Sequence, residues 1–442
     1  NTLIMANNNN NKTLNVPNKR EQCQTCLSTA ERAELSPKGN VPNLRFPEFK
    51  GEWKRYKLED IAKRVMRKNK GNISKLPLTI SAQYGLVDQI TFFNKVVASS
   101  NMSNYYLLKQ GEFAYNKSYS SDYPWGAIKR LEKYNEGALS SLYICFAPTE
   151  LVDSDYLVHY FETTKWYQGI SEIAVEGARN HGLLNVAISD YFGTCHFIPQ
   201  NMAEQKKLAR FLNLIDERID TQNKIIEKLQ SLIKGIIDAL LNNPSWEKSY
   251  LSSFMQFYST NSLSWDQLSY TEGEIRNLHY GLIHSFQTIE IDTAFLPKIQ
   301  QSFIPKQYTL CHAGDVAFAD ASEDTNEIGK TIEFIAIDSG TVCGLHTIHG
   351  RDIKNKTLVG FKGYVLNSRY FHDQIRRLAQ GTKVFSITAN NLSSCFVYIP
   401  ELTKQKNIVK LLNAYEELLS TNKILLKQYE NQKGYLLQQM FI

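Results

Sequence analysis

The sequence has no run of apolar residues that reaches the roughly 18 to 20 needed to cross a membrane. Residues 1–12 also lack the basic-then-apolar order of a secretory signal. Cysteine is sparse: seven residues, an odd number, are spread along 442 positions. This usage argues against a disulfide framework and for a reducing compartment, so we expect a cytoplasmic protein.

The net charge of the chain is also small. Lys and Arg number 50 against 44 Asp and Glu, which gives a net charge of +6. This balance allows a polyanionic partner but does not identify one. With 43% hydrophobic and 21% charged residues, the composition is that of a globular protein, and the length suits about three domains of roughly 150 residues.

Motifs of nucleotide-dependent enzymes are missing. No two glycines are separated by a single residue, so we expect neither a dinucleotide fingerprint nor an S-adenosylmethionine loop on this chain. Gly329-Lys330-Thr331 resembles the end of a phosphate loop, but position 324 is Asp where that loop needs Gly. Gly-x-Ser-x-Gly is absent as well. The sequence therefore predicts no catalytic site.

Two fragments carry residue types that bind metals. Cys23-x-x-Cys26 has no second cysteine pair to complete a zinc site. Cys343, His346 and His349 are spaced by three residues, so they cannot share one face of the strand predicted there. We predict no metal site.

The chain repeats itself at an offset of 200 residues. In each copy, an apolar strand-like stretch ends in Ile-Pro shortly before a long helical pattern. The matches are Cys195 with Cys395, Gln205-Lys206 with Gln405-Lys406, Leu212-Asn213 with Leu412-Asn413, Glu217 with Glu417, and Thr221 with Thr421. Weaker matches upstream pair residues 53–58 with 246–251, and residues 111–115 with 314–318. The sequence therefore predicts one module followed by a long helix, present twice.

The predicted fold class is α+β, with strands that include residues 142–146 and 331–337. We expect Asp153 to cap a helix that carries Val158, Phe161 and Trp166, and residues 364–379 to form its counterpart. The predicted domains are a disordered extension at 1–40, module one at 41–200, a central helix at 201–245, module two at 246–400, and a C-terminal helix at 401–442.

Both helices carry apolar residues in alternating steps of four and three, which is typical of a coiled-coil seam. Gln222 and Asn422 occupy matching places in the two seams. A buried amide costs stability but penalises wrong registers, so we predict that this pair fixes the register; the alternative is that each amide faces solvent. The seams run through Leu208, Leu212, Ile215, Ile219, Gln222, Ile226, Leu229, Ile233, Ile236 and Leu240, and through Ile408, Leu412, Tyr415, Leu419, Asn422, Leu426, Tyr429, Lys433, Leu436 and Met440.

Connectivity sets the direction in which these helices pair. The second module must join the end of the first helix to the start of the second, and a compact module has its ends close together. We therefore expect the second helix to run back antiparallel along the first, with a module at each end and pseudo-two-fold symmetry.

In this order, these features resemble the specificity (S) subunit of a type I DNA restriction-modification system, over about residues 41–442. The segments that carry the resemblance are residues 41–53 (VPNLRFPEFKGEW), 176–184 (EGARNHGLL), Ile198-Pro199 leading into Glu204-Gln205-Lys206, and 433–441 (KGYLLQQMF).

The resemblance implies a function and a set of partners. Each module would be a target recognition domain that reads one half of a bipartite, asymmetric DNA site, while the helices hold the two at a fixed spacing. The chain would have no catalysis of its own. It would dock two methyltransferase (M) subunits, which carry S-adenosylmethionine, and restriction (R) subunits. Because Lys404 stands where Glu204 does, we expect the second methyltransferase contact to be weaker or different.

Two other functions fit the same pattern. The first is the same subunit in a methylation-only defence system. The second is a coiled-coil scaffold whose modules bind protein or other ligands.

Basic residues and polar loops supply the candidate DNA contacts. The loops around Gly177 and Gly381 are included because a glycine turn lets the backbone approach the duplex. Solvated basic faces are the alternative interpretation of the charged residues. The candidates in module one are Arg67, Lys68, Lys70, Asn116, Lys117, Ser118, Ser120, Tyr123, Arg179, Asn180 and His181; those in module two are Asp320, Ser322, Lys330, Thr382 and Lys383.

Overall fold

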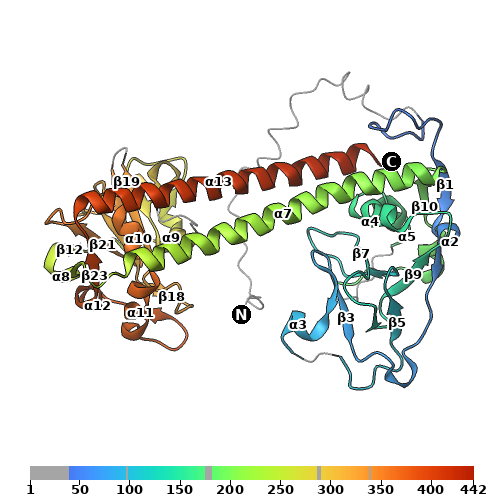
Figure 1. Ribbon diagram of the computed structural model, residues 1–442, viewed down its shortest axis with the longest axis horizontal. Coiled ribbons are helices and arrows are strands. Elements are labelled where there is room, and N and C mark those ends of the chain that lie inside the picture. Colours follow the sequence, from blue (N-terminus) through green and yellow to red (C-terminus); the bar gives the residue numbers. More distant parts are fainter. Residues whose placement is uncertain (1–38, 96–97, 175–181, 286–289, 338–339) are drawn as a thin grey trace. The chain divides into compact units, whose positions relative to one another are not determined.

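The structure is a computed structural model that describes residues 39–95, 98–174, 182–285, 290–337 and 340–442 (Figure 1). The described chain divides into two compact units. The first takes in the residues up to Ile219 together with Gln428–Ile442, and the second is Asp220–Lys427. Nearly all of the predicted extension, 1–40, lies outside the described residues. Among the helices that are described, none is both long enough and apolar enough to cross a membrane.

Two long helices are present where the seams predict them: α7, Met202–Leu241, and α13, Leu402–Gln439 (Figure 1). They contain 40 and 38 residues, and neither contains proline, which would interrupt the backbone hydrogen bonds. Every position of the two predicted seams is buried or half-buried. The apolar stripe of each helix is therefore the face that packs against other residues.

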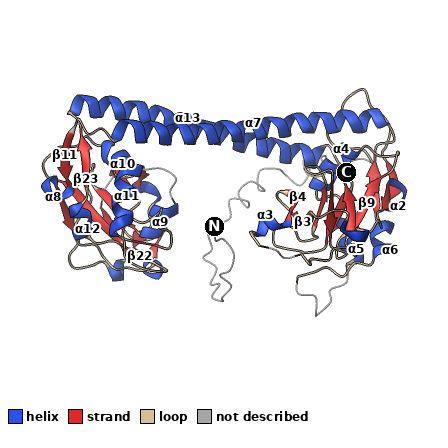
Figure 2. Ribbon diagram, turned by 60° about the horizontal axis from the view of Figure 1, so that its bottom comes forward, coloured by secondary structure: helices blue, strands red, loops and turns tan. Residues whose placement is uncertain are grey.

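The first unit contains two four-stranded sheets and a two-stranded ladder, flanked by short helices (Figure 2). The first sheet is β2(Ala62–Arg64), β9(Ile144–Pro148), β6(Phe113–Asn116) and β7(Ala127–Arg130), and the second is β4(Gly85–Asp88), β3(Pro77–Ser81), β8(Glu136–Leu139) and β5(Tyr106–Lys109). The ladder pairs β1(Lys54–Lys57) with β10(Cys195–Ile198). The helices are α2(Leu58–Ile61), η1(Lys70–Asn72), α3(Gln89–Phe93), α4(Ser154–Glu162), α5(Tyr167–Ile173) and α6(Ile188–Gly193).

The second unit contains a five-stranded and a four-stranded sheet. The first is β12(Met255–Tyr258), β21(Thr347–Asp352), β17(Val316–Ala319), β19(Thr331–Ala336) and β15(Glu290–Asp292), and the second is β13(Leu268–Ser269), β16(Lys298–Ile299), β14(Arg276–Leu278) and β20(Thr341–Cys343). Two ladders pair β11(Glu247–Tyr250) with β23(Phe396–Ile399), and β18(Ala321–Ser322) with β22(Phe385–Ser386). The helices are α8(Leu251–Phe254), η2(Trp265–Gln267), α9(Tyr280–Ser285), η3(Thr293–Phe295), η4(Gln301–Phe303), α10(Phe361–Val365), α11(Arg369–Leu378) and α12(Ala389–Ser394). Both units therefore have the predicted α+β class.

Gln205 and Gln405 show that the two modules are joined to their helices in the same way. The Gln205 side chain donates to the carbonyls of Leu151 and Pro199 and accepts from the Asp153 amide, at 3.2, 2.8 and 2.7 Å. Gln405 makes the matching bonds to Lys356, Pro400 and Leu358, at 2.9, 2.9 and 2.7 Å. Both side chains are fully buried, so each satisfies backbone groups that would otherwise be costly to bury.

Two helix predictions are corrected in their extent. Asp153 does cap α4, since its Oδ1 accepts from the amides of Asp155 and Tyr156 at 3.0 Å, but α4 ends at Glu162 and leaves Trp166 outside it. The predicted helix 364–379 is two helices, α10 and α11. The extended backbone of Ser368 separates them, because its hydroxyl caps α11 by accepting from the Phe371 amide at 3.4 Å.

The strand predictions need smaller changes. The strand expected at 331–337 is β19, and the one expected at 142–146 begins two residues later as β9. Leu142 is exposed, and the Tyr143 amide donates to the Ser140 carbonyl within a turn. An apolar residue in a turn therefore extended the predicted strand too far.

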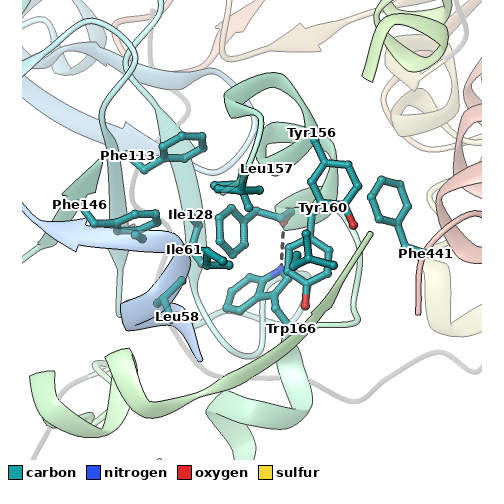
Figure 3. Close-up of a cluster of buried hydrophobic side chains, with 14 of the residues drawn as sticks. Leu58, Ile61, Phe113, Ile128, Phe146, Tyr156, Leu157, Tyr160, Trp166 and Phe441 are labelled. Atoms are coloured by element: carbon teal, nitrogen blue, oxygen red, sulfur yellow. Dashed lines mark hydrogen bonds between the residues drawn. The ribbon is translucent and has the colours of Figure 1, made fainter. Parts of the chain in front are cut away.

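The core of the first unit is rich in aromatic rings (Figure 3). Phe441, just beyond α13, packs on Tyr156 and Tyr160 of α4, with ring centroids 5.4 and 6.1 Å apart. Leu208 and Leu212 of α7 belong to the same cluster. The C-terminal residues are thus part of the core of the first module.

Candidate nucleic-acid interface

In the first module, a loop at 116–123 leaves the end of β6. Asn116 Oδ1 accepts from the Ser118 amide at 3.0 Å, and Ser120 and Tyr123 exchange backbone hydrogen bonds of 3.1 and 3.2 Å. Gly126 ends the loop with a φ of +80°, and a Cβ there would lie 2.1 Å from the Asn116 carbonyl oxygen. The return of this loop therefore requires glycine.

The same loop pairs with residues 182–184, which come directly after the predicted contacts Arg179, Asn180 and His181. The Leu184 amide donates to the Lys117 carbonyl at 2.9 Å, and the Tyr119 amide donates to the Gly182 carbonyl at 3.1 Å. Arg179, Asn180 and His181 lie outside the described residues, but Gly182 follows them directly in the chain. The 116–123 loop thus pairs with the chain at Gly182 and Leu184.

The second module has a matching arrangement. Ser322 of β18 pairs with Phe385 of β22, and Gln380 and Ser386 exchange backbone hydrogen bonds of 3.0 and 2.8 Å. Thr382 and Lys383 are exposed between them. Gly381, with a φ of +135°, allows this turn, because a Cβ there would lie 1.9 Å from the Val384 carbonyl oxygen. The segment after β17 is therefore adjacent to the 381–384 turn.

Asp320 and Lys330 have charged partners within the second module. Asp320 Oδ1 lies 3.1 Å from His346 Nδ1, and burial raises the pKa of Asp320 although His346 opposes the shift. Lys330 Nζ lies 3.2 Å from Glu327 and donates to the His284 carbonyl at 3.4 Å. His284, whose Nδ1 lies 3.6 Å from Glu327, lowers the pKa of Glu327 to about 2, against the effect of burial and with help from Lys330. Lys330 is thus less available to a phosphate than the exposed Lys383.

Arg67 and Lys68, two basic candidates of the first module, contact residues outside the 116–123 loop. Arg67 donates to Glu112 at 3.0 and 3.2 Å and to the Leu107 carbonyl at 3.0 Å, and the Glu112 hydrogen bond raises the pKa of Arg67. Lys68 donates to the Asn104 carbonyl at 2.9 Å and lies 3.9 Å from the centre of the Tyr106 ring. These two side chains therefore hold the chain against β5, whereas the 116–123 loop leaves the other sheet.

Lys70 differs from these two neighbours. It is exposed at the start of η1. Gly71 and Asn72 that follow have φ values of +71° and +54°, so the chain turns directly after Lys70. Lys70 is thus an exposed lysine beside a tight turn.

The matched amides of the long helices contact each other within the second unit. Gln222 is buried, and its Nε2 donates to Oδ1 of Asn422 at 2.7 Å and to the Asn422 carbonyl at 3.1 Å. Asn422 is half-buried, and its Nδ2 donates to the Leu418 carbonyl at 2.8 Å. A role in fixing the register stays a prediction.

Glu204, assigned to a partner contact by analogy, lies inside the first module. It is 2% exposed; Arg45 donates to its two carboxylate oxygens at 2.6 and 2.8 Å, and Trp53 Nε1 donates to it at 3.2 Å. Sequence reasoning missed this role because Arg45 is 159 residues away from Glu204.

Comparisons with known proteins agree on one kind of protein. Over 249 residues the chain is 24% identical to the type I restriction enzyme MjaVIII specificity subunit of Methanocaldococcus jannaschii, and the match covers 52% of this chain and 58% of that protein. The chain is similar to a type I specificity subunit. It thus covers less than two thirds of that relative's length. No protein-family model matches.

Solved structures show the same similarity at the level of the fold. A chain from a study of complex assembly and conformational transition in a type I R-M system superposes with a TM-score of 0.58 at 13% identity, covering 88% of this chain and 97% of that one. The type I S subunit of M. genitalium matches 91% of this chain and 99% of that chain, with a TM-score of 0.49 and 15% identity. The resemblance predicted from the sequence is thus confirmed.

Proposed function

We propose that the chain is the DNA sequence-specificity subunit of a type I restriction-modification complex. The observation that carries this proposal is the doubled arrangement: in each module the loop after β6 or β17 pairs with a later segment, at Gly182–Leu184 or at Phe385–Ser386, and the module then continues into a long helix. Two equivalent loop pairs on one chain suit a DNA site with two halves.

Each module would read one half-site through these loop pairs. Exposed Lys383 and the exposed serines at 118 and 120 offer groups for phosphate contacts and for hydrogen bonds to base edges. Phosphate contacts position a protein on the duplex, whereas base-edge contacts carry the sequence information. Since the loops differ in sequence between the modules, the two half-sites would differ, which makes the whole site asymmetric.

The two long helices would hold the half-site readers at a fixed spacing. In the first unit, Leu208 and Leu212 cluster with Leu436 and Met440. In the second unit, Ile226 and Ile233 cluster with Leu419. Early residues of α7 thus cluster with late residues of α13, and later residues of α7 with an earlier residue of α13. This order supports an antiparallel coiled coil with pseudo-two-fold symmetry.

Such symmetry suits a chain that docks two copies of one partner. We infer that these are two methyltransferase subunits, which would carry S-adenosylmethionine, and that restriction subunits join the same assembly. The chain itself would supply recognition and no catalysis.

The proposal is tested by expressing this chain with the methyltransferase subunit of its own system, in a host without adenine methylation, and by mapping modified adenines with long-read sequencing. The expected result is one asymmetric motif of two short sequences around a fixed gap. Modification without a motif, or no modification although the two proteins co-purify, would contradict DNA reading and favour a scaffold that binds other ligands.

A further inference from the structure

Two buried cysteines and a buried histidine meet in the second module. Cys311 Sγ lies 3.5 Å from Cys343 Sγ, and one ring nitrogen of His349 lies within 4.8 Å of both sulfur atoms. All three residues are at most 3% exposed. His346, which the sequence places between Cys343 and His349, contacts Asp320 instead.

We propose that Cys311, Cys343 and His349 bind one zinc ion that acts as a structural staple of the second module. Thiolate and imidazole are the usual ligands of zinc, and ligand atoms around a tetrahedral zinc lie about 3.3 to 3.8 Å apart, given bonds of about 2.0 to 2.3 Å. The spacing of the two sulfur atoms fits this geometry. The ion would link the segment before β17 to β20 and β21.

The contact between His349 and Asp315 supports this assignment. His349 Nε2 lies 2.7 Å from Asp315 Oδ2, whereas the buried Nδ1 has no hydrogen-bond partner in the described part of the chain. A carboxylate on one ring nitrogen typically orients a histidine whose other nitrogen binds zinc. Nδ1 is thus the ring nitrogen that Asp315 leaves without a partner in the described part of the chain.

The charges of the site also suit a divalent cation. Arg351 donates to both carboxylate oxygens of Asp315, with distances of 2.7 to 3.1 Å, so this ion pair is neutral without the metal. Two thiolates next to Zn²⁺ would have no net charge, and binding would release two thiol protons to solvent.

The first module shows that the fold does not require these residue types. Cys311 stands three residues before Gly314, as Leu108 stands three residues before Gly111. Leu310 pairs with Val342 as Leu107 pairs with Ala138, so Cys343 takes the place of Leu139. Ala317 pairs with His349 as Ala114 pairs with Cys145.

These counterparts in the first module, Leu108, Leu139 and Cys145, are buried in an apolar cluster. The second module thus carries three potential zinc ligands where the same fold elsewhere packs without a metal. A pocket of about 620 Å³, lined by Cys343, His349 and polar residues such as Asn261 and Tyr308, gives water access to a fourth coordination position.

The test uses the full chain with Cys23→Ser and Cys26→Ser, which removes the other closely spaced thiols. Elemental analysis after dialysis against metal-free buffer should find about one zinc per chain, and Cys311→Ser with Cys343→Ser should lose it. Cys145→Ser, at the place in the first module that corresponds to His349, is the matched control and should retain the zinc.

A second variant separates metal loss from misfolding. Cys311→Leu with Cys343→Leu installs the side chains that the first module holds at these places, so it should fold, as judged by circular dichroism, but bind no zinc. The parent chain loaded with cobalt(II) should show thiolate-to-metal charge-transfer absorption that this variant lacks. Folded parent chain without zinc, zinc retained by the leucine variant or lost from the control, or a Cys311–Cys343 disulfide in the intact mass would overturn the proposal.

Discussion

Gln222 Nε2 donates to Asn422 Oδ1 at 2.7 Å, and the two residues are 200 positions apart, which is the offset of the repeat itself. Each residue thus meets its own counterpart. Residues that contact each other do not contribute independently to stability. We predict that Gln222→Ala and Asn422→Ala together cost less than the sum of the two single changes, by about 0.5 to 3 kcal/mol. Urea denaturation of the four chains measures this coupling, and strictly additive costs would contradict it.

Glu204 and Lys404 give a matched pair of substitutions at equivalent places. Glu204→Ala removes the buried carboxylate that accepts from half-buried Arg45 and buried Trp53, so we expect a loss of about 3 to 5 kcal/mol in the free energy of unfolding. Lys404 is exposed, with Nζ 5.2 Å from the centre of the Trp246 ring, and Lys404→Ala should cost less than about 1 kcal/mol. Equal effects in urea denaturation would show that the two sites do not differ as described.

His196 predicts a pH dependence of stability. It is buried between Tyr160 Oη and Thr194 Oγ1, each 2.8 Å from a ring nitrogen, and burial lowers the pKa of His196 from 6.5 to about 4. The His196 ring of the unfolded chain takes up a proton at higher pH than the ring of the folded chain. The contribution of neutral His196 to the free energy of unfolding is therefore complete above pH 6.5 and is lost as the pH falls toward 4. It amounts to about 3 kcal/mol.

The variant His196→Gln isolates this effect, because glutamine keeps polar contacts but does not titrate. Urea denaturation at pH 7 and pH 4.5 should show a smaller decrease in stability for the variant than for the parent chain. An equal decrease in both would mean that other groups cause the acid sensitivity.

Lys383 is the exposed basic residue in the loop pair of the second module. Its replacement by alanine should weaken DNA binding of the methyltransferase complex and reduce the slope of log affinity against log salt by about 1, since one phosphate contact is lost. Lys410→Ala, an exposed lysine of α13, is the control and should leave the slope unchanged. A slope unaffected by Lys383→Ala would remove this residue from the DNA interface.

Much of the architecture was predictable because it depends on local patterns and on their repetition. Seam residues such as Leu212 and Leu412 follow a helical period, and Gln205 and Gln405 recur at the same offset because each satisfies the same three backbone groups. The α+β class followed from apolar strands and long helices in one chain.

Contacts between distant residues were not predictable in this way. The sequence around Arg67 does not indicate a partner, yet Arg67 pairs with Glu112, 45 residues away. Cys311 and Cys343 meet only because β20 and the segment before β17 are neighbours in space. Spacing within one strand cannot show such a pair.

The most direct test of the central claim, two readers held apart by paired helices, is to shorten both helices together. Removing one heptad from α7 and the matching heptad from α13 keeps both seams in phase and shortens each helix by about 10 Å. Mapping of modified adenines should then show the same two half-site sequences, separated by a gap that is shorter by at most about three base pairs. An unchanged gap in a complex that still methylates DNA would contradict the account.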